Sequence, residues 1–142
     1  MRKLTKLAAD GTDLPADAAG HLAVRLDHGL LAQPIVWTAH RSEKRLTWKQ
    51  AVKWAEKLDI NGWSWRLPTV EEAFLLPDRS RTEYALVDPA FFPDCDGEWI
   101  WTSTEDLVPP SGCAWSVGLA YGYSGLGPRS NRGRVRAVRV GQ

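Results

Sequence analysis

The chain has 142 residues, of which 44% are hydrophobic and 25% charged, and this size and composition are typical of one globular domain over residues 1–142. Its formal net charge of +1 favours no class of partner. The sequence contains no apolar run of about 18 residues and no apolar core of a signal peptide. We therefore expect a soluble, cytoplasmic protein that does not associate with membranes.

Tryptophan is unusually frequent, with eight residues against three tyrosines and three phenylalanines. Indole combines a large apolar area with one N–H donor, which suits a core that is built from irregular loops. We expect most of the tryptophans to lie in the core.

The first half of the chain predicts two short strands followed by two helices. Alternation over residues 21–26 and the run after Pro34, residues 34–38, favour strands. Thr47 and Gln50 form a capping box that begins a helix over about 47–58. Its apolar side chains recur at helical spacing, at Trp48, Ala51, Val52, Ala55 and Leu58.

A second capping box, formed by Thr69 and Glu72, predicts a short helix over about 69–76. Pro68 keeps the residue before it extended, so this helix cannot begin earlier. Upstream, Trp63 and Trp65 are two residues apart and share one face if extended, which places Arg66 on the opposite face.

The second half of the chain predicts long loops and further strands. Prolines and acidic residues indicate an irregular connection over residues 77–97. Strands are expected over residues 98–104, 113–119 and 134–140, with a glycine-rich loop over residues 120–133 before the last of them. Strands that segregate from helices in this order predict an α+β fold.

Several segments, taken in order, resemble the family named for the C-terminal domain of the Legionella collagen-like protein, over about residues 10–140. They are LTWKQAVKWAEKL, WRLPTVEEAFLL, FFPDCDGEWIWTST, CAWSVGLAYG and RVRAVR. The resemblance implies a C-type-lectin-like fold, of the superfamily that includes the formylglycine-generating enzymes, with two helices that flank a twisted antiparallel sheet and with long loops. It also implies that structural signatures of the family are present at Trp65, Arg66, Pro68, Thr102 and Arg139.

The sequence favours no catalytic activity, cofactor or metal. The three histidines have no HExxH spacing, and neither a GxSxG motif nor a phosphate-binding loop occurs. Cys95 and Cys113 match no cysteine pattern of the formylglycine-generating enzymes, and a disulfide between them stays open. Calcium binding by Asp88 and the acidic segment 94–98 also stays open, although a solvated acidic loop is favoured because the EF-hand spacing and the lectin signatures are absent.

The strongest candidate for a binding site is the glycine-rich segment near the C-terminus. Residues 107–142 contain five arginines and no acidic residue. Tyrosine and arginine on a frame of glycine, serine and asparagine are typical of binding surfaces, although a mobile loop with solvated arginines is an equally weighted alternative. The candidate residues are Tyr121, Tyr123, Arg129, Ser130, Asn131, Arg132 and Arg134.

Members of the resembled family are binding modules, among them adhesins for sulfated glycans, and copies of this length resemble open reading frames of bacteriophages and prophages. We therefore expect a non-catalytic binding module that acts on a host protein complex, for instance as an inhibitor of a bacterial defence system in the host cytoplasm. The alternative is a binder of sulfated glycan or another polyanion, whose charges arginine recognises in pairs of hydrogen bonds. Nucleic acid is disfavoured as a partner but stays open.

Overall fold

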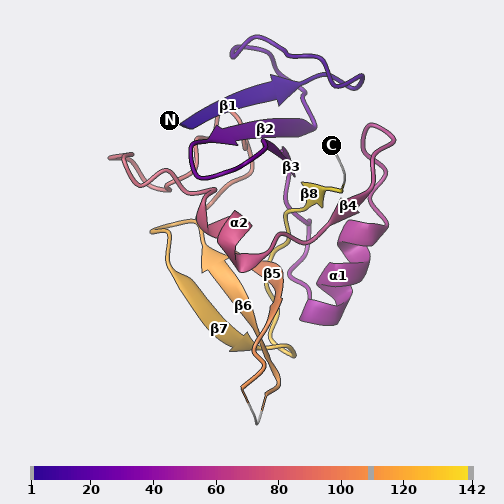
Figure 1. Ribbon diagram of the computed structural model, residues 1–142, viewed down its shortest axis with the longest axis vertical. Coiled ribbons are helices and arrows are strands. Elements are labelled where there is room, and N and C mark those ends of the chain that lie inside the picture. The colour runs from indigo at the N-terminus through magenta and orange to yellow at the C-terminus, as the bar shows by residue number, and fades with distance from the viewer. Residues whose placement is uncertain (1, 109–110, 141–142) are drawn as a thin grey trace.

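The computed structural model describes residues 2–108 and 111–140, which form two antiparallel sheets with two short helices beside them (Figure 1). The five-stranded sheet has the order β1-β2-β3-β8-β4, with β1 at Arg2–Leu7, β2 at Ala23–His28, β3 at Ile35–Thr38, β8 at Val138–Arg139 and β4 at Trp65–Arg66. The three-stranded sheet has the order β5-β6-β7, with β5 at Trp99–Glu105, β6 at Cys113–Gly118 and β7 at Ser124–Pro128. The helices are α1 at Trp48–Glu56 and α2 at Val70–Phe74. This mixture of helices and antiparallel strands confirms the predicted α+β class.

The helix predictions are confirmed, with ends a few residues shorter than expected. Both capping boxes are formed, because the hydroxyls of Thr47 and Thr69 each accept a bond from the third helical amide. In return, the backbone amides of the two threonines donate to the side chains of Gln50 and Glu72. Ala51 and Ala55 lie on the buried face of α1 and pack in a core cluster with Trp65. The amphipathic pattern therefore identified the face of α1 that the fold buries.

The first strand, β1, was not predicted from the sequence. It pairs with β2 in an unbroken register from Arg2↔His28 to Leu7↔Ala23. Its alternation is obscured by Lys6, which is buried although it carries an ammonium group. The ammonium is satisfied by the carbonyl of Ala18 at 2.5 Å and lies over the ring of Phe91.

The prediction of a loop over residues 120–133 is wrong at its centre, where Ser124–Pro128 form β7. Gly125 lies beneath the indole of Trp99, since a Cβ atom added there would be 3.5 Å from the ring. The ring of Trp99 therefore lies across β7 at ordinary contact distance, while the closer approach, 2.9 Å from an added Cβ, is at Gly118 of β6. Of the strand predicted over 134–140, only Val138–Arg139 is regular, while residues 135–138 are all buried.

The core forms two clusters, and each contains some of the indole side chains that were expected there. Trp37 belongs to the cluster between the two sheets, whereas Trp65 and Trp101 belong to the cluster beneath α1. Three more tryptophans pack against the second cluster, namely Trp48, Trp54 and Trp63. The expectation that most tryptophans serve the core is therefore confirmed.

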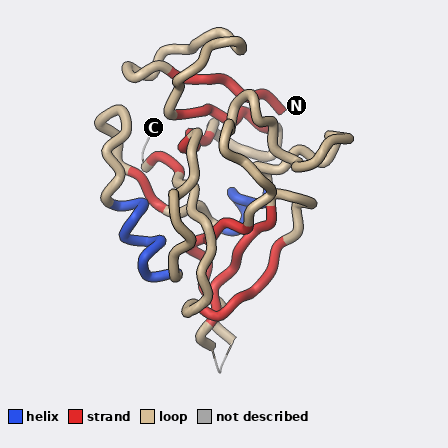
Figure 2. The backbone as a smooth tube through the Cα atoms, turned by 180° about the vertical axis from the view of Figure 1, so that it is seen from behind, coloured by secondary structure: helices blue, strands red, loops and turns tan. Residues whose placement is uncertain are grey.

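A fully buried arginine, Arg136, joins three segments that are far apart in the sequence. Its guanidinium donates to Glu98 at 3.0 Å, to Asp94 at 2.8 Å and to the carbonyl of Ala39 at 2.8 Å. The prediction of a solvated acidic loop is wrong for Glu98, whose side chain is only 4% exposed. The long connection over residues 77–97, seen from behind in Figure 2, is irregular as predicted but is fixed at its end by this arginine.

Candidate binding site

The predicted tyrosines and arginines form two surfaces, because β7 separates them. Tyr121 and Tyr123 lie in the turn before β7, whereas Arg129 and Arg132 follow its end. Five strand residues at about 3.3 Å each span roughly 16 Å. Figure 1 shows the turn and the arginine segment at opposite ends of this strand.

The first surface is a tyrosine ridge formed by Tyr84, Tyr121 and Tyr123, which are 67%, 64% and 66% exposed. Neighbouring ring centroids are 6.0 Å and 6.1 Å apart. The turn that carries the ridge is fixed by Arg79, which donates to the carbonyl of Gly122 at 2.7 Å. Tyr84 was missed in the sequence because it lies in the long irregular connection, where no pattern distinguishes it.

Two of the predicted arginines are held by contacts within the chain. Arg129 forms an ion pair with Glu105 at 3.1 Å and lies over the ring of Trp48. Arg134 donates to the carbonyls of Ser42 and Glu43. These guanidinium groups fix the segment after β7 in place, so they have little capacity left for a ligand.

Arg132 is different, because its exposed side chain has no hydrogen bond or ion pair within residues 2–108 and 111–140. It lines a groove of about 290 Å³ together with Arg41, Arg45, Asp96 and Trp99. Arg45 is also exposed and has no side-chain partner among the described residues. Arg41 contacts Asp96 at 2.6 Å, and this contact lowers the pKa of the Asp96 carboxyl. The groove thus holds one ion pair, between Arg41 and Asp96, and two guanidinium groups that have no partner among the described residues.

Trp99 forms a flat wall of this groove. A Cβ atom on Gly118 would lie 2.9 Å from the indole, so the ring is seated directly on the backbone of β6. The residue is 48% exposed, which leaves its other side open to solvent. A second groove, of about 300 Å³, adjoins the ring and is lined by Ser116, Asn131 and again Arg132. Ser130 is exposed nearby but lines neither groove.

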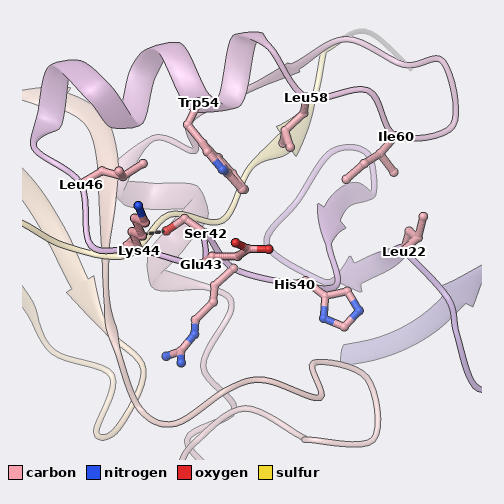
Figure 3. A pocket seen from close by; sticks show the side chains of 10 residues that line it. Leu22, His40, Ser42, Glu43, Lys44, Leu46, Trp54, Leu58 and Ile60 are labelled. Carbon is pink, nitrogen blue, oxygen red and sulfur yellow. Dashed lines mark hydrogen bonds between the residues drawn. The ribbon is translucent and has the colours of Figure 1, made fainter.

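A third hollow, of about 420 Å³, lies beneath α1 (Figure 3). Trp54 points from the helix into it, with Leu58 and Ile60 on one side and His40 near its far end. Ser42 also lines it, but its hydroxyl donates to Lys44 at 2.7 Å and accepts from the amide of Val135 at 3.1 Å. That hydroxyl fixes the loop and is not available as a nucleophile.

The thiol of Cys95 is partly buried and unreactive, and it is not paired with Cys113. Cys95 and Cys113 are both free, so the structure contains no disulfide between them. Burial, followed by the nearby Glu98 carboxylate, raises the pKa of the Cys95 thiol to about 11. A thiol with this pKa is protonated at neutral pH and is a poor nucleophile. Across the described part of the chain, no group of three or more histidine, cysteine or acidic residues is placed to hold a metal ion.

The residues carried over as family signatures lie on β4, β5 and β8 and directly before α2. Trp65 and Thr102 are buried, and Thr102 donates to the carbonyl of Trp115 at 2.8 Å. Arg66 forms two parallel bonds with Glu72, at 2.8 Å and 2.9 Å. Two further signatures connect neighbouring segments: the carbonyl of Pro68 accepts from Ser103, and Arg139 lies over the ring of Trp63 at 4.1 Å.

Together these observations define an α+β domain that displays two adjoining grooves around a seated tryptophan. The chain belongs to the family of the Lcl C-terminal domain, whose family model matches residues 31–139. The match begins after β2, so the first hairpin lies outside it. Searches of curated proteins and of solved structures found no match. None of the helices in the described ranges has the length and apolar character that crossing a bilayer requires.

Proposed function

We propose that the chain is a non-catalytic binding module that captures an anionic partner at the grooves around Trp99. The observation that carries this proposal is the contrast among the arginines. Arg129 and Arg134 are held by the chain itself, whereas Arg45 and Arg132 have no partner among the described residues. A guanidinium group offers five donors and recognises carboxylate, sulfate or phosphate with paired hydrogen bonds.

The partner that we propose first is an acidic segment of a protein, in a host complex if the chain is expressed by a phage. The tyrosine ridge supports this choice, because exposed tyrosines beside arginines are typical of protein interfaces. Ridge and grooves together extend along β7 for a distance that suits a macromolecular partner. A sulfated glycan is the second candidate, and the open side of Trp99 favours it, since a sugar ring can stack on an indole.

We further propose that the fold is C-type-lectin-like. Two features support this assignment. The helices stand beside the junction of the two sheets, and the last strand, β8, returns to lie between β3 and β4 of the sheet that β1 begins (Figure 1). In this fold, loops before the last strand form the recognition face, which is where Arg132 lies.

The test compares two double variants that each remove two positive charges from exposed positions. Arg45→Gln/Arg132→Gln removes the free guanidinium groups, and Lys49→Gln/Lys53→Gln removes two exposed ammonium groups of α1. The probes are immobilised heparin and an immobilised hexaglutamate peptide at low ionic strength. We expect the wild type and the lysine variant to be retained on at least one probe, and the arginine variant to flow through.

Two outcomes contradict the proposal. The first is flow-through of the wild type on both probes, because exposed arginine–anion contacts are strongest at low salt. The second is equal retention of the two double variants, which assigns binding to overall charge and not to the grooves. Retention on heparin but not on the peptide favours the glycan over the protein partner.

A further inference from the structure

β7 is an edge strand whose outer side has no neighbour in the described parts of the chain. The sheet has the order β5-β6-β7, and β7 pairs only with β6. Figure 1 shows β7 along the outer margin of the molecule. An open edge of this kind presents backbone donors and acceptors in the spacing that another strand requires.

The register of β6 and β7 decides which groups point outward. The amide of Gly118 donates to the carbonyl of Tyr123 at 2.8 Å, so these two residues form a hydrogen-bonded pair. Because bonded and non-bonded pairs alternate in an antiparallel ladder, Gly125 also bonds to β6. Ser124 and Leu126 therefore direct their N–H and C=O groups away from the sheet.

The open edge is short and well defined. Both of its residues are exposed, Leu126 at 47%. Pro128 closes it, since proline has no N–H and its carbonyl already accepts from the amide of Asn131 at 2.9 Å. Two donors and two acceptors remain, which is enough for a peptide of a few residues to pair with the strand.

A groove lies on each face of the sheet beside this edge. On one face, a groove of about 520 Å³ is lined by Leu30, Phe74 and Trp115 and reaches Ser124. On the other face, the groove of about 300 Å³ beside Trp99 and Arg132 is floored by the glycines of β7. Side chains of an added strand alternate between the two faces, so each groove receives every second side chain.

We propose that an extended segment of a partner protein adds to β7 as a fourth strand, with apolar and acidic residues in alternation. Its apolar side chains enter the groove at Phe74 and Trp115. Its carboxylates face the free guanidinium of Arg132. This inference rests on the proposed function, because it assigns the anionic partner a conformation and a docking strand.

The test uses a fluorescent peptide with alternating sequence, acetyl-EVEVEV, and a control peptide of the same composition, acetyl-EEEVVV. We expect the alternating peptide to bind at least tenfold more tightly than the control in fluorescence anisotropy. Leu126→Pro removes one outward N–H that makes no bond within the sheet, whereas Leu126→Ala keeps it. We expect at least a tenfold loss of affinity for Leu126→Pro relative to Leu126→Ala.

Residue-resolved hydrogen exchange on the wild type provides a second measurement that needs no variant. The amides of Ser124 and Leu126 are expected to gain protection when the alternating peptide binds. Unchanged exchange at these amides contradicts strand addition, as does equal affinity for the two peptides. This result remains decisive if Leu126→Pro does not fold.

The outcomes separate the two proposals. Retention on hexaglutamate that Leu126→Pro leaves unchanged, together with no preference for the alternating peptide, refutes strand addition but keeps the anion-binding function. Retention of the Arg45→Gln/Arg132→Gln variant tests only the proposed function, which its loss supports. If sedimentation shows a dimer of the wild type that Leu126→Pro abolishes, and the peptide does not bind, a second copy occupies the edge and the proposed partner is wrong.

Discussion

Replacing Arg136 with methionine is the sharpest test of how the loops are held. The methionine approximately preserves the length of the side chain but removes the bonds that Arg136 donates to Glu98, to Asp94 and to the carbonyl of Ala39. The perturbation therefore leaves two carboxylates without their shared cation. We expect a large loss of folding stability, because a buried carboxylate without a cation destabilises the folded state more than the intact ion pair does.

The magnitude follows from how deeply each carboxylate lies. Each carboxylate keeps one backbone donor, the amide of Asp96 for Glu98 at 3.2 Å and the amide of Arg41 for Asp94 at 2.9 Å. Glu98 is only 4% exposed and is not reached by water, whereas Asp94 is 30% exposed. Most of the penalty therefore comes from Glu98. Breaking one side of a buried pair costs about 3–5 kcal/mol. Against a total stability of about 5–15 kcal/mol, this loss is a large share of the folding free energy.

The assay is equilibrium unfolding in urea, monitored by tryptophan fluorescence, and the matched control is Arg136→Met/Glu98→Met. If the orphaned carboxylate causes the penalty, the double variant is more stable than the single variant by at least about 2 kcal/mol, because an apolar pair replaces the buried charge. A single variant that loses less than about 1 kcal/mol refutes the reasoning. So does a double variant that is no more stable than the single one.

Three further predictions concern a helix cap, a carboxylate and a thiol. Thr69→Ala removes the cap of α2 and is expected to cost about 1 kcal/mol in urea unfolding, whereas Thr69→Ser restores most of it. Burial raises the pKa of Glu72, but bonds from Arg66 and Thr69 outweigh it, so the net pKa lies below its ordinary value. The stability from Glu72 is therefore present above about pH 4.3 and is lost as the pH falls through the lowered pKa, and Glu72→Gln is expected to show a smaller decline in that range. Iodoacetamide is expected to modify Cys95 of a Cys113→Ser variant slowly at pH 7.5 and faster as the pH approaches about 11, and a rate that does not change with pH contradicts a buried, protonated thiol.

The sequence predicted the elements whose signals are local. Both helices begin at the residues that their capping boxes indicate, since a capping box is complete within four residues. Strands β5 and β6 also lie where they were predicted, β5 from the alternation of Trp99 and Trp101 and β6 from the run over residues 113–119. β7 was missed because glycine is depleted in strands, and its pairing with β6 is a contact that the local sequence does not indicate.

The remaining errors concern contacts between distant segments. Arg136 and Arg139 have similar neighbours in the sequence, yet Arg136 is buried against carboxylates 38 and 42 residues away. No local pattern distinguishes the two arginines, because their partners lie elsewhere in the chain. Arg45 was missed for the same reason, since it reaches the candidate site from the loop before α1. The candidate tyrosines and arginines looked like one loop only because the strand between them was not recognised.

The position of β8 has a consequence for how the protein is made. This two-residue strand lies between β3 and β4, so the five-stranded sheet is divided until β8 itself has been synthesised. The bond from Arg136 to Ala39 likewise closes a separation of 97 residues. Such distant contacts slow folding. Until they form, a nascent chain exposes the unpaired edges of both parts of the sheet. We expect ribosome-bound chains that lack β8 to depend on chaperones, whereas chains that contain β8 fold without them.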